Sequence, residues 1–246
     1  MEASSLRAFR EGAQHTLPLI IGAVPFGIVF GTLGPASGLS MVATLAMSLL
    51  VFAGSAQFIA LGLLASGTPV SLVIAVTFVV NLRHLLYAVT LMPSVRHLPL
   101  SWRAPMSFWL TDETFAVVVK RMSSEHCSEF NWYYLGSALS MYGNWQLCTI
   151  IGLLAGAWLP GIENWGLDVA MAVTFIGIVV PQISSSPRLI CATTACVCSL
   201  LWHNWPHHTG LFAAAIAAVT LAMLTEKLTG KTDIFDSNAN QGPRGG

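Results

Sequence analysis

The sequence predicts an all-α, polytopic integral membrane protein, and three observations support this fold class. Of its 246 residues, 54% are hydrophobic and only 9% are charged, whereas soluble domains carry roughly 25% charged residues. Its mean hydropathy is +0.68. Its apolar residues form runs close to the roughly 20 residues that an α-helix needs to cross a bilayer, not the short alternating segments of a β-barrel.

Breakers rich in glycine, proline and serine divide the chain into seven or eight apolar segments, each predicted to be a helical span. In order, the segments are Leu17–Leu33, Leu39–Ala65, Pro69–Met92, Pro105–Val119, Trp132–Leu159, Leu167–Val180, Leu189–Trp202 and Leu211–Leu224. Residues 1–16 are expected to form a cytoplasmic N-terminal segment, 17–227 a single transmembrane domain, and 228–246 a polar, disordered tail.

The basic residues of the loops conflict about how the chain is oriented. Those before the first segment favour a cytoplasmic N-terminus. Two basic pairs flank the segment Pro105–Val119 at opposite ends: Arg96 with Arg103, and Lys120 with Arg121. If this segment crosses fully, the two pairs cannot both be inside. One resolution is that Leu39–Ala65 forms two half-helices and not one simple crossing.

A glycine, a serine and a glutamine interrupt the second segment, in the stretch VFAGSAQF at residues 51–58. One interpretation is an unwound turn inside the membrane, because Gly54 allows a turn while Ser55 and Gln57 offer hydrogen-bonding groups. The N–H groups that begin a half-helix after Gly54 would then attract an anion, and a carboxylate is the natural occupant. The other interpretation is a close helix–helix contact, in which Gln57 bonds a neighbouring helix. Composition alone does not decide between the two.

A faint internal repeat is consistent with one interrupted helix in each half of the chain. LIIG at residues 19–22 is echoed by TIIG at 149–152, and Gly-Leu at 38–39 by Gly-Leu at 166–167. A similar distance after the second pair leads to VVPQISSSPR at residues 179–188, which contains Gln182. Paired interrupted segments indicate a transporter binding site, although matches of four letters also arise by chance.

Polar and ionisable residues lie inside the third and fourth segments. They are Asn81, Arg83, His84 and Tyr87 in the third segment, and Asp112 and Glu113 in the fourth. Ionisable groups at this depth cost about 2.5–3.5 kcal/mol each on insertion scales and are functional candidates. The candidates for substrate binding are Gly54, Ser55, Gln57, Asn81, Tyr87 and Gln182.

The spacing of Arg83 and Asp112 predicts an ion pair. Arg83 lies fifteen residues before Leu98, the centre of the intervening loop, and Asp112 lies fourteen residues after it. In an antiparallel hairpin the two would have nearly equal depth, and pairing would reduce the insertion cost of each. His84 and Glu113 would then titrate near the working pH and handle protons. The alternatives are a purely structural ion pair and a neutral, hydrogen-bonded histidine.

Neither a metal nor a cofactor is expected. Cys191, Cys196 and Cys198 lie inside an apolar run, where small buried hydrophobic residues are the simpler interpretation. The histidines of HNWPHH, residues 203–208, indicate an interfacial loop. The net charge of +0 indicates no basic face for nucleic acid. The chain contains neither Gly-x-Ser-x-Gly nor His-Glu-x-x-His, so an intramembrane enzyme is disfavoured.

Four stretches, in order along the chain, resemble the AzlC family. They are LPLIIGAVPFGIVFG, FAGSAQF, NLRHLLYAVTL and WLTDETFA. This family comprises the larger permease subunits of two-component branched-chain amino acid exporters of bacteria. The resemblance carries specific motifs from about Phe9 to Met122 and continues in length and hydropathy to about Lys227.

The resemblance implies export of valine, leucine or isoleucine across the inner membrane, coupled to the proton gradient, together with a small membrane partner of the AzlD type. The motif residues carried over are Gly54, Gln57, Arg83, His84, Tyr87, Thr111, Asp112 and Glu113. Some members have Asp where this chain has Asn81. If that Asp carries the coupling proton in those members, another group must do so here, and His84 and Glu113 are the obvious substitutes. A passive channel for a small polar solute is the competing function.

Overall fold

The computed structural model describes residues 3–122, 129–158, 185–202 and 209–229, together with residues 176, 180 and 183. The chain divides into two compact units, Met1–Thr174 and Phe175–Gly246. Every regular element in the described ranges is a helix, which agrees with the predicted fold class. That residues 17–227 form a single transmembrane domain stays a prediction.

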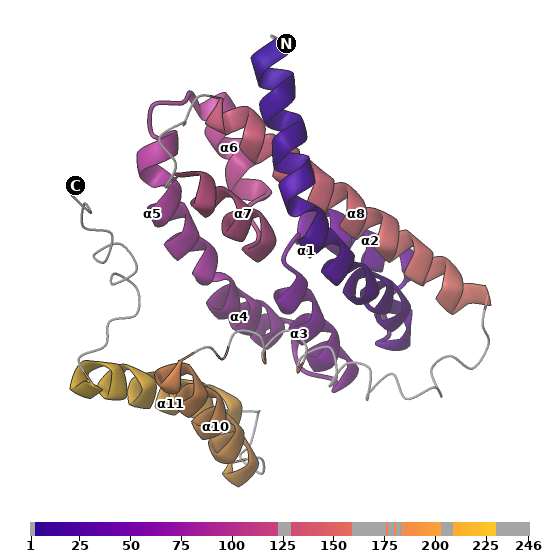
Figure 1. The fold of residues 1–246 in the computed structure, drawn as a ribbon. Coiled ribbons are helices and arrows are strands. Elements are labelled where there is room, and N and C mark those ends of the chain that lie inside the picture. Colours follow the sequence, from indigo (N-terminus) through magenta and orange to yellow (C-terminus); the bar gives the residue numbers. More distant parts are fainter. Residues whose placement is uncertain are drawn as a thin grey trace. The chain divides into compact units, whose positions relative to one another are not determined.

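The first unit is organised around two long helices, α1 (Ala3–Ala36) and α8 (Phe130–Trp158). They run in the same direction, since Gly12 of α1 faces Tyr133 of α8 and Gly31 faces Thr149 (Figure 1). Helix α1 begins at Ala3, whereas hydropathy predicts a start at Leu17. The reason is packing, because the polar first turns of α1 already lie against α8.

Glycines let α1 and α8 approach until their backbones touch. A Cβ at Gly31 would collide with the carbonyl oxygen of Thr149, and one at Gly152 would collide with that of Ile28. In membranes, where apolar surfaces gain little from leaving lipid, such close contacts through small residues hold helices together.

We expect Gly31→Ala to destabilise the protein by about 1–3 kcal/mol, the usual cost of overpacking a tight contact. The matched control is Gly22→Ala on the same helix, where a Cβ would meet nothing within 4 Å. The measurement is thermal unfolding of the purified full chain. Equal stability of the two variants would contradict the close packing of α1 on α8.

The predicted second segment is broken into α2 (Met41–Leu50) and α3 (Gly54–Ala65). At 10 and 12 residues, they measure about 15 and 18 Å, roughly half the thickness of a bilayer core. Thr44, in the first turns of α2, faces Gly34 near the end of α1. Farther along α2, the hydroxyl of Ser48 forms a hydrogen bond with that of Thr149 in α8. The segment is therefore two half-helices, one of the arrangements that the sequence left open.

The third segment forms one long stretch made of α4 (Val70–Asn81) and α5 (Arg83–Val95). Only Leu82 separates the two helices, and its N–H still donates to the carbonyl of Val79 at 3.2 Å. Val70–Val95, with 26 residues, is long and apolar enough to cross a membrane, as is α1. The predicted span Pro69–Met92 is confirmed.

The predicted fourth span, Pro105–Val119, is wrong as a single helix. The structure has α6 (Leu100–Phe108) and α7 (Asp112–Met122), separated by three residues. The break has a local cause, because the side chain of Thr111 accepts a hydrogen bond from the Thr114 N–H at 3.3 Å and caps α7. Two acidic residues then occupy the first turn of α7, where they complement the helix dipole.

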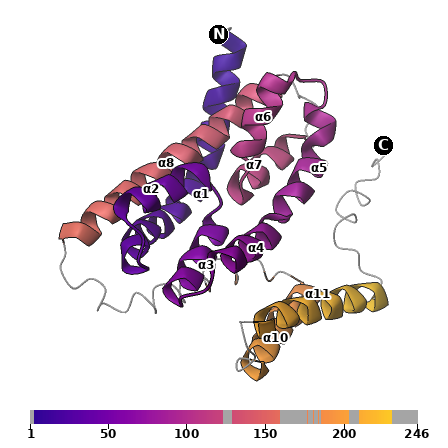
Figure 2. The ribbon, with the colours of Figure 1, turned by 180° about the vertical axis from the view of Figure 1, so that it is seen from behind.

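Helices α6 and α7 resolve the charge conflict noted in the sequence. Leu98 and Trp102, before and within α6, pack on the same hydrophobic cluster as Met122 at the end of α7. The cluster also contains Ala8, from the first turns of α1, and Figures 1 and 2 show α6 and α7 together at that end of the unit. The chain enters α6 and leaves α7 at the same end of the first unit. The pair Arg96 with Arg103 and the pair Lys120 with Arg121 therefore both lie at that end.

The second unit contains α10 (Ser186–Leu201) and α11 (Thr209–Thr229), which pack on each other. They confirm helices at the predicted segments Leu189–Trp202 and Leu211–Leu224. The four cysteines that the structure describes are free. The histidines at 203–208, most of the segment Leu167–Val180, and the tail at 230–246 lie outside the described residues.

Candidate functional site

The two helix breaks of the first unit meet at one aromatic side chain, Tyr142 of α8. Its ring lies 4.9 Å from that of Phe52 in the first break. It also lies 6.1 Å from Trp109 in the second break and 6.3 Å from Phe108, which ends α6. The unwound segments at residues 51–53 and 109–111 are therefore neighbours in space, although they are far apart in sequence.

Gln57 stabilises the first break by capping the end of α2. Its Nε2 donates to the carbonyl of Val51 at 2.7 Å and to that of Met47 at 3.2 Å. The Met47 carbonyl also accepts from the Val51 N–H, and the Val51 carbonyl from the Ala53 N–H, so Gln57 adds a second donor to each carbonyl where α2 ends. Gln57 is fully buried, and its Oε1 has no partner among the described residues. The glutamine in this apolar run thus bonds across the break.

The start of α3 exposes hydrogen-bond donors to the break. Its N-cap residue is Ala53, which supplies no side-chain cap, so the N–H groups of the first turn lack a helical acceptor. The Ser55 hydroxyl is buried without a partner in the described structure. The ring of Trp145 lies directly against Gly54, with Cη2 3.2 Å from where a Cβ would stand. Glycine is thus the residue that fits here.

The predicted ion pair is present beside the second break. Arg83 Nη1 lies 2.7 Å from Asp112 Oδ2, and the Tyr87 hydroxyl donates to Asp112 Oδ1 at 2.7 Å. Tyr87 also stacks on Phe115 of α7, with ring centroids 4.3 Å apart. Arg83 begins α5 and Asp112 begins α7, so the network ties the middle of the long stretch Val70–Val95 to the start of a half-helix.

The remaining predicted residues lie next to this network. His84 Nδ1 is 3.1 Å from the carbonyl of Asn81, and its ring lies edge-on to Tyr87. The His84 Nε2 and Asn81 Oδ1 atoms are buried without partners in the described structure. Glu113 follows Asp112 in the first turn of α7. Gln182 lies outside the described residues, so its place in the site stays a prediction.

Sequence reasoning missed the aromatic residues that line the breaks. They are Phe52, Trp109, Tyr142 and Trp145. Two signals were available: Trp109 lies two residues before the motif residue Thr111, and Tyr142 and Trp145 belong to MYGNWQ, a polar interruption of the fifth apolar segment. Aromatic residues are common in membrane helices, so their role became visible only once the breaks were located.

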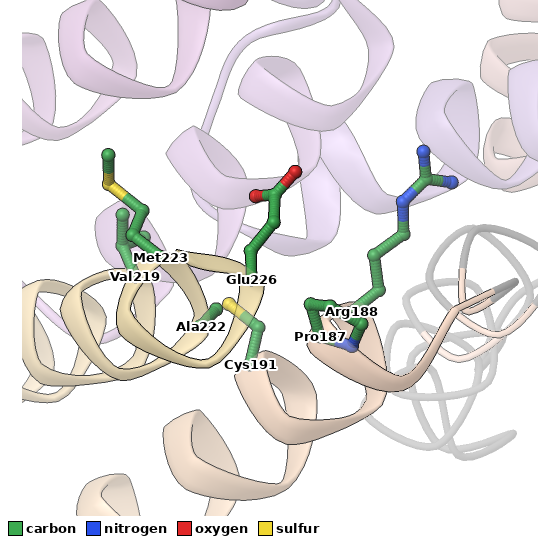
Figure 3. Close-up of a pocket in the computed structure, with 7 residues that line it drawn as sticks. All are labelled: Pro187, Arg188, Cys191, Val219, Ala222, Met223 and Glu226. Carbon is green, nitrogen blue, oxygen red and sulfur yellow. The ribbon is translucent and has the colours of Figure 1, made fainter. Parts of the chain in front are cut away.

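No metal site is found in the described ranges, which contain no group of three potential His, Cys, Asp or Glu ligands. The second unit has a pocket of 190 Å³ between α10 and α11 (Figure 3). It is lined by Pro187, Arg188, Cys191, Val219, Ala222, Met223 and Glu226. No predicted site residue lines this pocket, whereas unpaired buried polar atoms gather at the breaks of the first unit. We therefore place the candidate site at the breaks.

The sequence profile of the AzlC protein family matches residues 18–159, a range that includes both breaks and the ion pair. The chain belongs to the AzlC family. Its similarity to a membrane protein of Helicobacter pylori is 30% identity over 178 residues, 72% of this chain and 76% of the relative. No solved structure matches the chain.

Two further AzlC relatives carry informative names. The inner membrane protein YgaZ of Escherichia coli is 29% identical over 199 residues, 78% of this chain and 80% of the relative. The branched-chain amino acid transport protein AzlC of Bacillus subtilis is 26% identical over 175 residues, 71% of this chain and 68% of the relative. The chain is thus a multi-pass protein of the inner membrane.

Proposed function

We propose that this AzlC-family protein exports branched-chain amino acids across the inner membrane by secondary, proton-coupled transport. The observation that carries the proposal is the meeting of two helix breaks at Tyr142. Breaks inside a membrane are tolerated where they line a cavity or are buried in protein, and discontinuous helices form the substrate sites of many transporters. The name of the Bacillus subtilis relative supports the choice of substrate.

The start of α3 suits the carboxylate of an amino acid. First-turn N–H groups and the Ser55 hydroxyl are donors, and the helix dipole adds positive potential at this end. Gln57 Oε1, an acceptor without a partner in the described structure, suits the ammonium group. The rings of Phe52, Tyr142 and Trp109 offer an apolar surface to a branched side chain.

The ion pair next to the breaks favours coupled transport over a passive channel. Arg83, Asp112 and Tyr87 form a bonded network, and charged networks within the membrane are typical of proton relays and ion pathways. A passive channel needs a continuous polar pore and has no use for such chemistry. We assign Asn81 and Tyr87 to the substrate side of the site, and His84 and Glu113 to proton handling.

Efflux of preloaded radiolabelled leucine from vesicles tests the proposal. We expect efflux that valine and isoleucine inhibit and that stops when a protonophore collapses the proton gradient. We also propose a small partner of the AzlD type, held through helix contacts in the bilayer, so efflux should be weak without it. Efflux that ignores the protonophore would favour the channel, and no leucine efflux with the partner present would refute the function.

The proton-handling role predicts the behaviour of two further variants. His84→Gln and Glu113→Gln should insert normally but flatten the dependence of efflux on pH, because each removes a titratable group and keeps a polar side chain of similar size. The measurement is the initial efflux rate across a pH series. His97→Gln, at an exposed position, is the control. Unchanged pH profiles in both variants would remove the support for this role.

A further inference from the structure

The junction between α4 and α5 deprives one backbone carbonyl of its usual helical partner. In an unbroken helix, the N–H of Leu85 would donate to the carbonyl of Asn81, four residues earlier. At this junction the Leu85 N–H donates instead to the carbonyl of Leu82, at 3.0 Å. The carbonyl of Asn81, the last residue of α4, is bonded by a side chain, since Nδ1 of His84 lies 3.1 Å from it.

This bond fixes which ring nitrogen of His84 carries the hydrogen in the neutral form. A backbone carbonyl can only accept, so Nδ1 must be the donor and Nε2 must hold a lone pair. His15 provides a contrast, because its Nδ1 lies 2.8 Å from the Tyr133 hydroxyl, which can donate or accept. That contact leaves the tautomer of His15 open, whereas the junction between α4 and α5 selects one tautomer of His84.

The lone pair on Nε2 of His84 is available for a proton. The atom is buried and has no donor among the described residues. The carboxylate of Asp112, by contrast, is engaged by Arg83 and by the Tyr87 hydroxyl, each at 2.7 Å. Protonation of Asp112 would weaken an ion pair, whereas protonation of Nε2 breaks no hydrogen bond of the described structure and keeps the Nδ1 bond in place.

The charged and titratable groups beside His84 come from α5 itself and from α7, which packs against α5 (Figure 1). They are Arg83 and Tyr87 on α5, and Asp112 and Glu113 in the first turn of α7, while α4 has no ionisable residue. The ring of Tyr87 lies edge-on to His84, with centroids 5.9 Å apart. A proton on His84 adds positive charge beside Arg83 and near the negative Asp112, so its uptake is linked to the ion pair that joins α5 to α7.

We propose that the junction at Leu82 sets the tautomer of His84 through the Asn81 carbonyl, and that Nε2 is therefore the atom that binds and releases the coupling proton. Uptake of one proton from water converts the neutral imidazole into imidazolium, and its release restores the imidazole. The coupling role rests on the proposed function, whereas the tautomer depends only on the fold. Asn81 acts here as a positioning residue through its backbone, a role separate from that of its side chain.

Nitrogen-15 NMR of the full chain in lipid nanodiscs tests the tautomer. Only His84 and His97 follow an arginine in this sequence, so labelling arginine carbonyls and histidine nitrogens selects these two, and His97→Gln leaves His84 alone. Correlation to the ring carbons distinguishes Nε2, bonded to Cδ2, from Nδ1, bonded to Cγ. At high pH we expect a protonated Nδ1 and an unprotonated Nε2 in His84. A neutral His84 with its hydrogen on Nε2 would overturn the inference.

The exposed His97 is the matched control within the same chain. With no fixed acceptor at Nδ1, it should show mainly the opposite tautomer, which free histidine favours. The contrast between the two histidines shows that the fold, and not the solvent or the lipid, selects the tautomer of His84.

The coupling role is tested by following the same signals across a pH series, beside the initial rate of leucine efflux by the full chain with its small partner. We expect the signal of unprotonated Nε2 to be lost as the pH falls, over the range in which the efflux rate changes. Nδ1 should remain protonated throughout, because its bond to the Asn81 carbonyl persists. An Nε2 that stays unprotonated over this range would refute its role in coupling.

Failure of the inference and failure of the proposed function give different results. If leucine efflux is absent or ignores a protonophore, proton-coupled export is refuted and the coupling role of Nε2 falls with it. If efflux is proton-coupled but His84 has the opposite tautomer, or its Nε2 does not titrate with efflux, the inference alone is refuted. An Nδ1–H tautomer whose Nε2 signal is lost in step with efflux supports the assignment.

Discussion

Arg83→Ala and Asp112→Ala should each reduce the amount of folded protein severely, whereas the double variant should lose less than the sum. The two side chains meet at 2.7 Å, between the middle of Val70–Val95 and the start of α7. Removing one partner leaves an unpaired charge within a membrane segment, where an ionisable group costs about 2.5–3.5 kcal/mol on insertion scales. Removing both leaves no such charge, so the cycle should give a clear coupling energy.

The measurement is the abundance of protein in the membrane, taken for the parent, both single variants and the double variant. Arg7→Ala is the control, because this arginine is 83% exposed and its contact with Glu11 is a surface pair, a type that contributes little. Tyr87→Phe should have a smaller effect of about 1.5 kcal/mol, since it removes one hydrogen bond to the charged Asp112. Strict additivity of the two alanine changes would refute the pair.

The ion pair illustrates how a spacing argument can reach a right contact through a wrong fold. The spacing argument places Arg83 and Asp112 at equal depth because it assumes an antiparallel hairpin of two full spans, with Leu98 at its centre. The structure instead brings the chain back through the short helices α6 and α7, so Asp112 reaches Arg83 from a half-helix. Charge pairs are predictable because a lone charge is costly in a membrane, whichever helix supplies the partner.

Half-helices cannot be deduced from hydropathy, because two short apolar helices and one long one have the same composition. Local chemistry holds the missing information. Thr111 stands before two acidic residues, a typical helix start, in the middle of what hydropathy predicts to be one span. Gly54 and Gln57 are recognisable as an interruption of the second segment, and Gln57 proves to cap the helix before the break.

The pairing of α1 with α8 could not be predicted from the sequence either. Glycines are frequent in membrane helices, and nothing in the sequence distinguishes Gly31, which touches the backbone of α8, from Gly22, where a Cβ would enter open space. The distinction depends on which helix lies opposite, a long-range fact. The same holds for Tyr142, whose function as a meeting point of both breaks requires the position of three separate segments.

Gly54→Leu should abolish leucine efflux while the protein still inserts and folds. A Cβ at this position would already stand 3.2 Å from Trp145 Cη2, so a leucine side chain must displace that ring or shift the start of α3. Either movement disturbs the donors at the proposed carboxylate site, while the long contact between α1 and α8 remains. Gly54→Ala should keep part of the activity, because its single methyl group needs a shift of only a few tenths of an ångström.

Initial efflux rates, divided by the amount of folded protein in the membrane, measure the effect. Gly22→Leu is the matched control, since the same side chain there would enter open space, and its rate should equal that of the parent. The efflux rate per folded molecule should fall in the order parent, Gly54→Ala, Gly54→Leu, as a steric effect at the break predicts. A general loss of stability would instead lower the abundance of the protein and leave the rate per folded molecule unchanged. Normal efflux by Gly54→Leu would show that the start of α3 does not approach the substrate, because a donor site this close to Trp145 has no room for four additional carbon atoms.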